Sequence, residues 1–202
     1  MRVINYDKDM LKMIEQLKKD GVKPTLLLHA CCAPCASYPI EILKDAFDLT
    51  VYFYNPNMDT ESEYTLRAEE LKRLCKEFNV NCVIEAFNSQ DYYAVVKGLE
   101  NEFEGGSRCK KCFYLRLGKT ANYAKENGFD YFATTLTVSP LKNAKVLNDI
   151  GLELQQETGV KYLCTDFKKR NGYIRSTELS REFDLYRQNY CGCVYSKNSI
   201  IK

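Results

Sequence analysis

The sequence Thr25-Leu-Leu-Leu-His-Ala-Cys-Cys-Ala-Pro-Cys35 joins an apolar run directly to three closely spaced thiols. The run itself, Thr25–Leu28, lies between Pro24 and Pro34, and a short apolar run with such punctuation is typical of a strand buried on both faces. Ligands of parallel α/β sheets bind at the carboxyl ends of the strands. We therefore expect the thiols to belong to a functional site at a strand end.

Further apolar runs, separated by segments with helical periodicity, continue this pattern along the chain. The expected strands are Leu49–Tyr54, Cys82–Phe87, Tyr131–Thr137 and Lys161–Phe167. The expected helices cover residues 7–20, 38–43, 61–78, 92–96, 108–127, 146–158 and 177–186. Strands that alternate with helices predict right-handed βαβ units, so the expected fold class is α/β, doubly wound, with a mostly parallel five-stranded sheet. One domain, 1–202, accounts for this length.

Two residues are expected to start helices. Asp7 is placed to cap the first helix, and Pro39 suits the first turn of the helix that follows the thiols. The thiol loop would then lie between a strand end and a helix amino terminus, which favours thiolates and other anions.

Composition narrows the class of protein. The chain has 45% apolar residues and a net charge of +2, with 9 basic and 4 acidic residues from Lys161 onward. This basic carboxyl-terminal part fits a polyanionic partner such as a nucleic acid. We expect no signal peptide, no membrane span and a cytoplasmic location. Ten cysteines in a reducing compartment favour metal or redox chemistry over disulfides.

Seven of the ten cysteines form three groups that bear on function, namely Cys31, Cys32 and Cys35, then Cys109 and Cys112, then Cys191 and Cys193. A structural zinc site would need only four thiolates. A thioredoxin-like redox enzyme would use only the pair Cys32 and Cys35. A 4Fe-4S cluster also takes four thiolates, which leaves three thiols for a further metal site or for catalysis. Cys75, Cys82 and Cys164 are expected in the core. The single histidine, His29, is expected either to serve the site or to pack at the strand end.

With these residues assembled, the chain resembles the epoxyqueuosine reductase family of the QueH type nearly from end to end. The resemblance rests on His29-Ala-Cys-Cys-Ala-Pro-Cys35, Tyr54-Asn-Pro-Asn57 with Glu63, Tyr64 and Arg67, Gly105-Gly-Ser-Arg-Cys-Lys-Lys-Cys-Phe-Tyr-Leu-Arg116, Thr134-Thr-Leu-Thr-Val-Ser-Pro140, Asp166-Phe-Lys-Lys169 and Tyr186-Arg-Gln-Asn-Tyr-Cys-Gly-Cys-Val-Tyr-Ser196.

The resemblance implies a fold of the nucleotide α-hydrolase type, like that of the PP-loop ATPases. Thiols and a proline replace the glycine-rich phosphate loop here, which argues against the use of ATP. The implied reaction is a two-electron deoxygenation, in which the epoxide of epoxyqueuosine in a tRNA anticodon loop becomes the alkene of queuosine. The implied cofactor is a 4Fe-4S cluster, with a possible second metal ion that binds the epoxide oxygen.

The implied site has three sets of residues. We expect the cluster ligands to be Cys109 and Cys112 with two of Cys31, Cys32, Cys191 and Cys193. Cys35 and His29 are expected on the reacting side. The expected substrate contacts are Asn55, Asn57, Tyr64 and Arg67 to the base and Lys168, Lys169, Arg170 and Arg175 to phosphates.

The implied partners are tRNA that carries epoxyqueuosine and an external low-potential electron donor. Two alternatives remain at this point. The first is an ATP-dependent tRNA-modifying enzyme of the PP-loop type, and the second is a non-catalytic metal-binding module that binds RNA.

Overall fold

A computed structural model describes residues 4–200. The elements in chain order are α1 (Tyr6–Asp20), β1 (Thr25–His29), α2 (Ala33–Leu43), β2 (Asp48–Phe53), α3 (Glu61–Glu77), β3 (Asn81–Ile84), α4 (Gln90–Val96), α5 (Ser107–Glu126), β4 (Tyr131–Thr134), the 3-10 helix η1 (Thr135–Val138), α6 (Ala144–Thr158), β5 (Lys161–Tyr162), α7 (Gly172–Glu182) and α8 (Val194–Ile200). Within these residues no helix is both long and apolar enough to cross a membrane.

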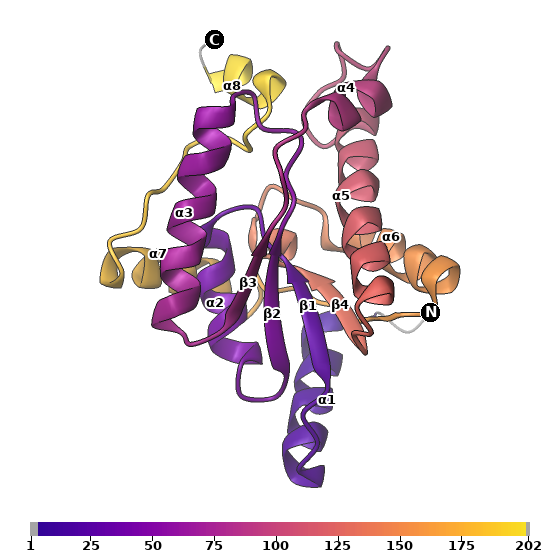
Figure 1. Cartoon of the computed structure of the whole chain (residues 1–202), viewed down its shortest axis with the longest axis vertical. Helices are drawn as coiled ribbons and strands as arrows, with labels where there is room; N and C mark the ends of the chain where they lie inside the picture. Colours follow the sequence, from indigo (N-terminus) through magenta and orange to yellow (C-terminus); the bar gives the residue numbers. More distant parts are fainter. Residues whose placement is uncertain (1–3, 201–202) are drawn as a thin grey trace.

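The five strands form one parallel sheet in the order β3-β2-β1-β4-β5. The chain runs outward from β1 through β2 to β3, then returns to β4 on the other side of β1 (Figure 1). The gap between β1 and β4 is therefore the topological switch point, where ligands bind in such sheets. The sequence prediction of a doubly wound parallel sheet is confirmed.

Helices cover both faces of the sheet (Figure 1). Alternate residues of β1 point to opposite faces, as the two-residue period of a strand requires. Leu26 and Leu28 pack with side chains of α1, α2, α3 and α7, whereas Leu27 packs with those of α5 and α6. All three leucines are fully buried. The central strand is thus anchored on two cores, which fixes the position of the residues that follow it.

Several predicted boundaries were wrong, for local reasons. β4 ends at Thr134 because its hydroxyl accepts a hydrogen bond from the Leu136 amide and starts a 3-10 turn. β5 is only two residues long, and the Asn148 side chain bonds both backbone groups of Thr165 in place of a strand partner. Helix α7 begins at Gly172, where a Cβ would lie 1.8 Å from the Phe167 carbonyl oxygen.

Both helix-start predictions were also wrong. Asn5, rather than Asp7, caps α1 through a hydrogen bond from the Lys8 amide. Helix α2 begins at Ala33, so Pro34 occupies its first turn and Pro39 lies inside the helix. The thiol loop is consequently shorter than expected, and α2 starts directly at the thiols.

Candidate active site

Three thiols lie together at the carboxyl end of β1, beside the switch point. Cys31 and Cys32 form the link to α2, and Cys35 lies in its first turn. The three sulfur atoms are all within 4.8 Å of one another, and those of Cys31 and Cys32 are 3.7 Å apart. Cys31 and Cys32 are buried, and Cys35 is partly buried. Three thiols at such distances can act as ligands of one metal ion or cluster.

The three thiols of this triad change one another's acidity. Hydrogen bonds from Cys32 and Cys35 lower the pKa of the Cys31 thiol well below its ordinary value. Burial raises the pKa of the Cys32 thiol to about 12, and the hydrogen bond to Cys31 raises that of Cys35. Cys31 is therefore the most acidic of the three thiols, and metal binding would ionise all three.

A second group of thiols combines the start of α5 with the segment that precedes α8. Cys112 and Cys193 belong to one buried apolar cluster with Tyr92. Burial raises the pKa of Cys109, Cys112 and Cys193, and the charge of Cys191 raises each of these pKa values further. These four cysteines thus lie in one neighbourhood. Cys109 and Cys112 with Cys191 and Cys193 form one of the ligand sets expected from the sequence, whereas the closeness of Cys35 to Cys31 and Cys32 was not expected.

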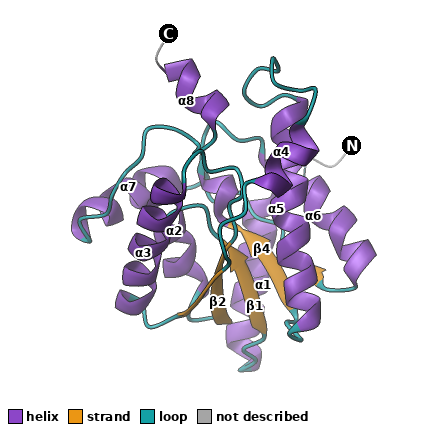
Figure 2. Cartoon of the chain, turned by 45° about the horizontal axis from the view of Figure 1, so that its top comes forward, coloured by secondary structure: helices purple, strands orange, loops and turns teal. Residues whose placement is uncertain are grey.

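The segment 186–197, which we call the strap, crosses the strand ends and includes the first four residues of α8 (Figure 2). Gln188 Nε2 lies 2.7 Å from the Cys32 sulfur, so the strap contacts the triad directly. Tyr190 donates a hydrogen bond to Asp59, and Lys197 forms an ion pair with the same carboxylate at 2.7 Å. The strap therefore carries Cys191 and Cys193 and is held to the core by Asp59.

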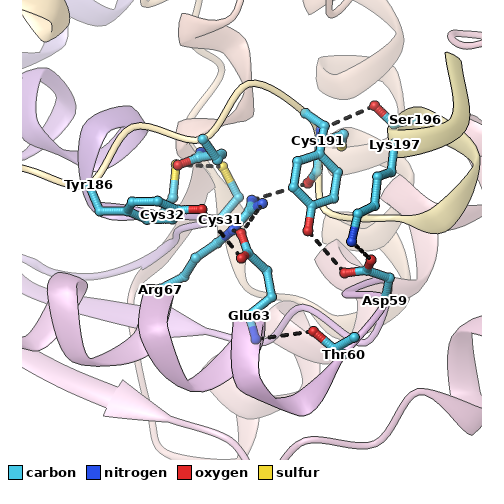
Figure 3. Close-up of polar contacts among 12 residues, drawn as sticks. Cys31, Cys32, Asp59, Thr60, Glu63, Arg67, Tyr186, Cys191, Ser196 and Lys197 are labelled. Carbon is cyan, nitrogen blue, oxygen red and sulfur yellow. Dashed lines mark hydrogen bonds and ion pairs between the residues drawn. The ribbon is translucent and has the colours of Figure 1, made fainter. Parts of the chain in front are cut away.

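Three cations surround the thiols. Arg67 lies between the triad and Cys191, donates to the Cys191 carbonyl and pairs with Glu63 at 2.7 Å (Figure 3). Arg116 is fully buried and donates to Asn55 Oδ1 at 2.5 Å. Burial lowers the pKa of the Lys142 ammonium, but nearby Cys191, Cys31 and Cys35 raise it to a net value above the ordinary one. The site thus has a positive surrounding that favours thiolates and other anions.

A cavity of about 310 Å³ opens beside Cys31 and Cys35. Its other lining residues include Arg67, Glu104, Lys142, Tyr173, Arg187, Gln188, Asn189, Tyr190 and Cys191. Aromatic faces, amides and charges of both signs are suited to the ring and polar edges of a nucleobase. The cavity is therefore a pocket whose inner wall carries thiols.

Of the four residues expected to contact the base, Arg67 alone lines this cavity. Asn57 is buried, and its side-chain amide has no hydrogen-bond partner among the described residues. Asn55 bonds the Ala30 carbonyl and Arg116. The Tyr64 hydroxyl donates to the Glu85 carbonyl, and its ring packs on Phe53. Through these contacts, Asn55 and Tyr64 stabilise the structure at the end of β2.

The four basic residues expected to contact phosphates lie away from the thiols. Lys168 and Lys169 line a separate outer groove, which Lys142 joins to the cavity. Arg170 pairs with Asp7 at 2.9 Å, and Arg175 pairs with Glu41 at 2.6 Å. The two lysines are thus placed near a route into the site, whereas the two arginines tie α7 and its preceding loop to α1 and α2.

His29, the last residue of β1, is fully buried. Its Nε2 lies 3.2 Å from the Tyr54 carbonyl oxygen and its Nδ1 lies 3.0 Å from the Thr134 hydroxyl. Burial and, next, the charge of Arg116 lower the pKa of His29 to about 3. The imidazole is therefore neutral, with Nε2 as donor, and it links β1 to the ends of β2 and β4.

Sequence reasoning missed Arg116, Lys142 and Gln188 as parts of the site. Arg116 had a detectable signal, because it lies four residues after Cys112 on a helix and therefore on the same face. Lys142 and Gln188 come from irregular segments whose course cannot be read from periodicity.

The fold and the site define a doubly wound α/β protein with a thiol-rich, cation-surrounded pocket at its switch point. A solved structure with a similar fold is that of the "U34-tRNA thiolase NcsA from Methanococcus maripaludis with its [4Fe-4S] cluster". The TM-score is 0.57 at 13% identity, over 94% of this chain and 67% of that chain. At this identity the likeness supports the fold alone.

Sequence comparison identifies the family. The family model described as "Epoxyqueuosine reductase QueH" matches residues 26–199. Epoxyqueuosine reductase QueH of Streptococcus pyogenes serotype M1 is 49% identical over 96% of this chain and 78% of its own length. That of Staphylococcus epidermidis is 42% identical over 96% of this chain and 84% of its own length. The chain therefore belongs to the epoxyqueuosine reductase QueH family, and the resemblance seen in the sequence is confirmed.

Proposed function

We propose that the chain reduces epoxyqueuosine in the anticodon loop of a cytoplasmic tRNA to queuosine, with the thiol pocket as the active site. The reaction takes two electrons and two protons, and the epoxide oxygen leaves as water. The observation that carries the proposal is the triad of Cys31, Cys32 and Cys35 beside a nucleobase-sized cavity, with Cys31 and Cys35 on its wall. Membership of the reductase family supports it.

The triad suits a 4Fe-4S cluster in its donor type, because it provides three soft sulfur donors in one pocket lined by cations. We propose Cys31, Cys32 and Cys35 as its protein ligands. When bound, such a cluster supplies low-potential electrons one at a time. The second thiol group, Cys109, Cys112, Cys191 and Cys193, offers four sulfur donors and is proposed to hold a further metal ion.

The chain's own residues would place the substrate. A single-stranded loop can extrude a base into a pocket, where aromatic side chains stack on it. Tyr173 and Tyr190 provide such faces on the cavity wall, and Gln188 and Asn189 provide amides for polar edges. Lys142 lies at the junction of the cavity with the outer groove of Lys168 and Lys169, so these lysines are proposed to bind the phosphates that flank the base.

In this proposal the protons and the electrons come from different sources. The Lys142 ammonium lines the cavity and is proposed to donate a proton to the departing oxygen. An external low-potential reductant is proposed as the electron source, since the chain itself provides only thiols.

The test is anaerobic reconstitution with iron and sulfide, followed by metal and sulfide analysis and an assay with a chemical reductant. The substrate is tRNA that contains epoxyqueuosine, and the product is read by nucleoside mass spectrometry. We expect bound iron and sulfide and loss of one oxygen from the nucleoside. Cys75→Ser, which alters a buried thiol outside the site, is the matched control and should retain both. A protein that binds no sulfide and leaves the nucleoside intact would contradict the proposal.

A further inference from the structure

Arg116 is a fully buried cation that has no carboxylate partner. Among the described side chains, residues 4–197, no ion pair includes Arg116. Its Nη2 donates to Asn55, its Nη1 lies 4.0 Å from the Cys112 sulfur, and its Nε has no hydrogen-bond partner. The guanidinium charge is therefore solvated by one neutral amide and one thiol.

Two other buried arginines, Arg67 and Arg108, have partners that balance or solvate their charge. Arg67 faces the carboxylate of Glu63 at 2.7 Å. Arg108, eight residues before Arg116 on α5, donates to the backbone carbonyls that precede the helix and lies 4.4 Å from the centre of the Tyr195 ring. An unpaired buried charge is strongly unfavourable, so Arg116 requires a negative charge nearby.

The groups near Arg116 that can supply a negative charge are thiols. Cys112 shares its helix face and contacts it, and the charges of Cys31 and Cys191 also act on the guanidinium. These cysteines come from both thiol groups of the site. Cysteine ligands lose their protons when they bind a metal, so metal loading would place negative charge around Arg116.

We propose that Arg116 is the internal counter-cation of the metal–thiolate centre, because only the loaded centre would surround it with several thiolates at once. The inference rests on the metal centre of the proposed function. It makes Arg116 a positioning residue that acts through the ligands, rather than one that touches the substrate. Two consequences follow, one for the metal-free chain and one for the loaded chain.

The metal-free chain should tolerate the loss of this charge. Arg116→Met removes a charge that has no carboxylate partner, whereas Arg67→Met takes the cation from the partly buried carboxylate of Glu63. In urea unfolding of the metal-free, reduced chain, we expect the midpoint of Arg116→Met to equal or exceed that of the wild type. The midpoint of Arg67→Met should fall below it. A fall in Arg116→Met as large as that in Arg67→Met would overturn the proposal.

The loaded chain should respond in the opposite sense. Arg116→Met should release iron to a chelator about tenfold faster than the wild type, as for other changes around metal ligands. Its midpoint reduction potential should be lower, because a cation that favours the reduced state is gone. Arg116→Lys keeps the charge and should behave nearly as the wild type in both measurements.

These outcomes separate the inference from the proposed function. If the wild type binds no iron, the proposed metal centre fails. If the wild type loads normally and Arg116→Met shows the same iron release and the same potential, the counter-cation role of Arg116 fails while the metal centre stands.

Discussion

Cys35 is the residue whose position most changes the view of the site. The sequence predicts Cys35 on the reacting side, and it does line the cavity; its sulfur also lies within 4.8 Å of those of Cys31 and Cys32, where it can act as a ligand. The reason is that α2 begins at Ala33, so its first turn brings Cys35 back over the preceding two thiols. When a metal ligand lies in the first turn of a helix, the residue at which the helix begins decides whether that ligand lies beside the others.

Replacement of single thiols should distinguish the two thiol groups. Cys35→Ser should lose most of the bound iron and acid-labile sulfide together, because it removes one of three converging ligands. Cys109→Ser should lose iron but retain the sulfide, since its group is proposed to hold a metal ion without sulfide. Iron and sulfide analysis of both reconstituted variants checks this. Equal loss of sulfide in the two would return Cys109 to the cluster, as the sequence suggested.

The hydrogen bonds of His29 predict a contribution to stability. His29→Phe would leave the Tyr54 carbonyl without its donor and the Thr134 hydroxyl without its acceptor in a fully buried place. Such orphaned groups cost about 1–3 kcal/mol each. The free energy of unfolding, measured in urea, should therefore fall by about 1 kcal/mol or more. A variant as stable as the wild type would show that these bonds are not needed.

At the residue scale, the sequence predicted identities better than partners. The prediction that Cys75 is a core residue is confirmed by its burial, whereas the prediction that the three cysteine groups serve the site remains a prediction. The contacts of Arg116 with Asn55 and of Gln188 with Cys32 join residues on separate or irregular segments. Such contacts depend on side-chain packing in three dimensions, which periodicity does not record.

At the scale of elements, the strap decides whether the second thiol group exists. Gly192 in this segment has φ +114°, and a Cβ there would lie 2.8 Å from the Met58 sulfur. Its carbonyl accepts a hydrogen bond from the Asp59 amide. The Cys-Gly-Cys sequence thus allows the strap to lie close against the turn after β2, with Cys191 and Cys193 on either side of the contact.

The carboxylate of Asp59 should control how firmly the strap docks. Burial raises the pKa of Asp59, but hydrogen bonds from Lys197 and Tyr190 lower it to a net value below the ordinary 3.8. The folded pKa is below the unfolded one, so its stabilising effect is complete above pH 3.8 and is lost as the pH falls through the folded pKa. Asp59→Asn should cost about 1 kcal/mol of unfolding free energy at pH 7.

The measurement for Asp59→Asn is urea unfolding of the metal-free chain at pH 7. Asp45→Asn is the matched control, because Asp45 is 63% exposed and pairs only with its neighbour Lys44. We expect no more than a few tenths of a kcal/mol for the control. If the two variants lose equal stability, the strap does not depend on Asp59.

Element types were more predictable than element ends. The apolar run of β1 and the helical stripe of α3 led to nearly correct bounds. The strap helix α8 was not predicted, and the ends of β4 and β5 were missed. In each of the two strands a polar side chain, from Thr134 or Asn148, takes over backbone hydrogen bonds that a longer strand would make.

At the scale of the whole molecule, the strand order explains why distant cysteines meet. The gap between β1 and β4 collects the loops that leave both strands, and the strap returns across the same edge of the sheet (Figure 1). The topology was predictable, because alternating strands and helices allow few arrangements. The return of the strap was not, because it depends on contacts such as those of Asp59 with Tyr190 and Lys197.

This arrangement predicts that metal loading tightens one part of the molecule selectively. The strap supplies Cys191 and Cys193 and contacts Cys32 through Gln188, so ligand bonds would hold it from several points. Amide hydrogens of residues 186–197 should exchange with solvent more slowly in the loaded chain than after chelation, by about tenfold or more if the bonds are worth at least 1.4 kcal/mol. Amides of β1 and β2, which pair within the sheet, should exchange equally in both forms. Hydrogen exchange read by mass spectrometry provides the comparison. If loading slowed exchange in the strands but left the strap unchanged, the strap thiols would not be ligands, and the metal would be held by the triad alone.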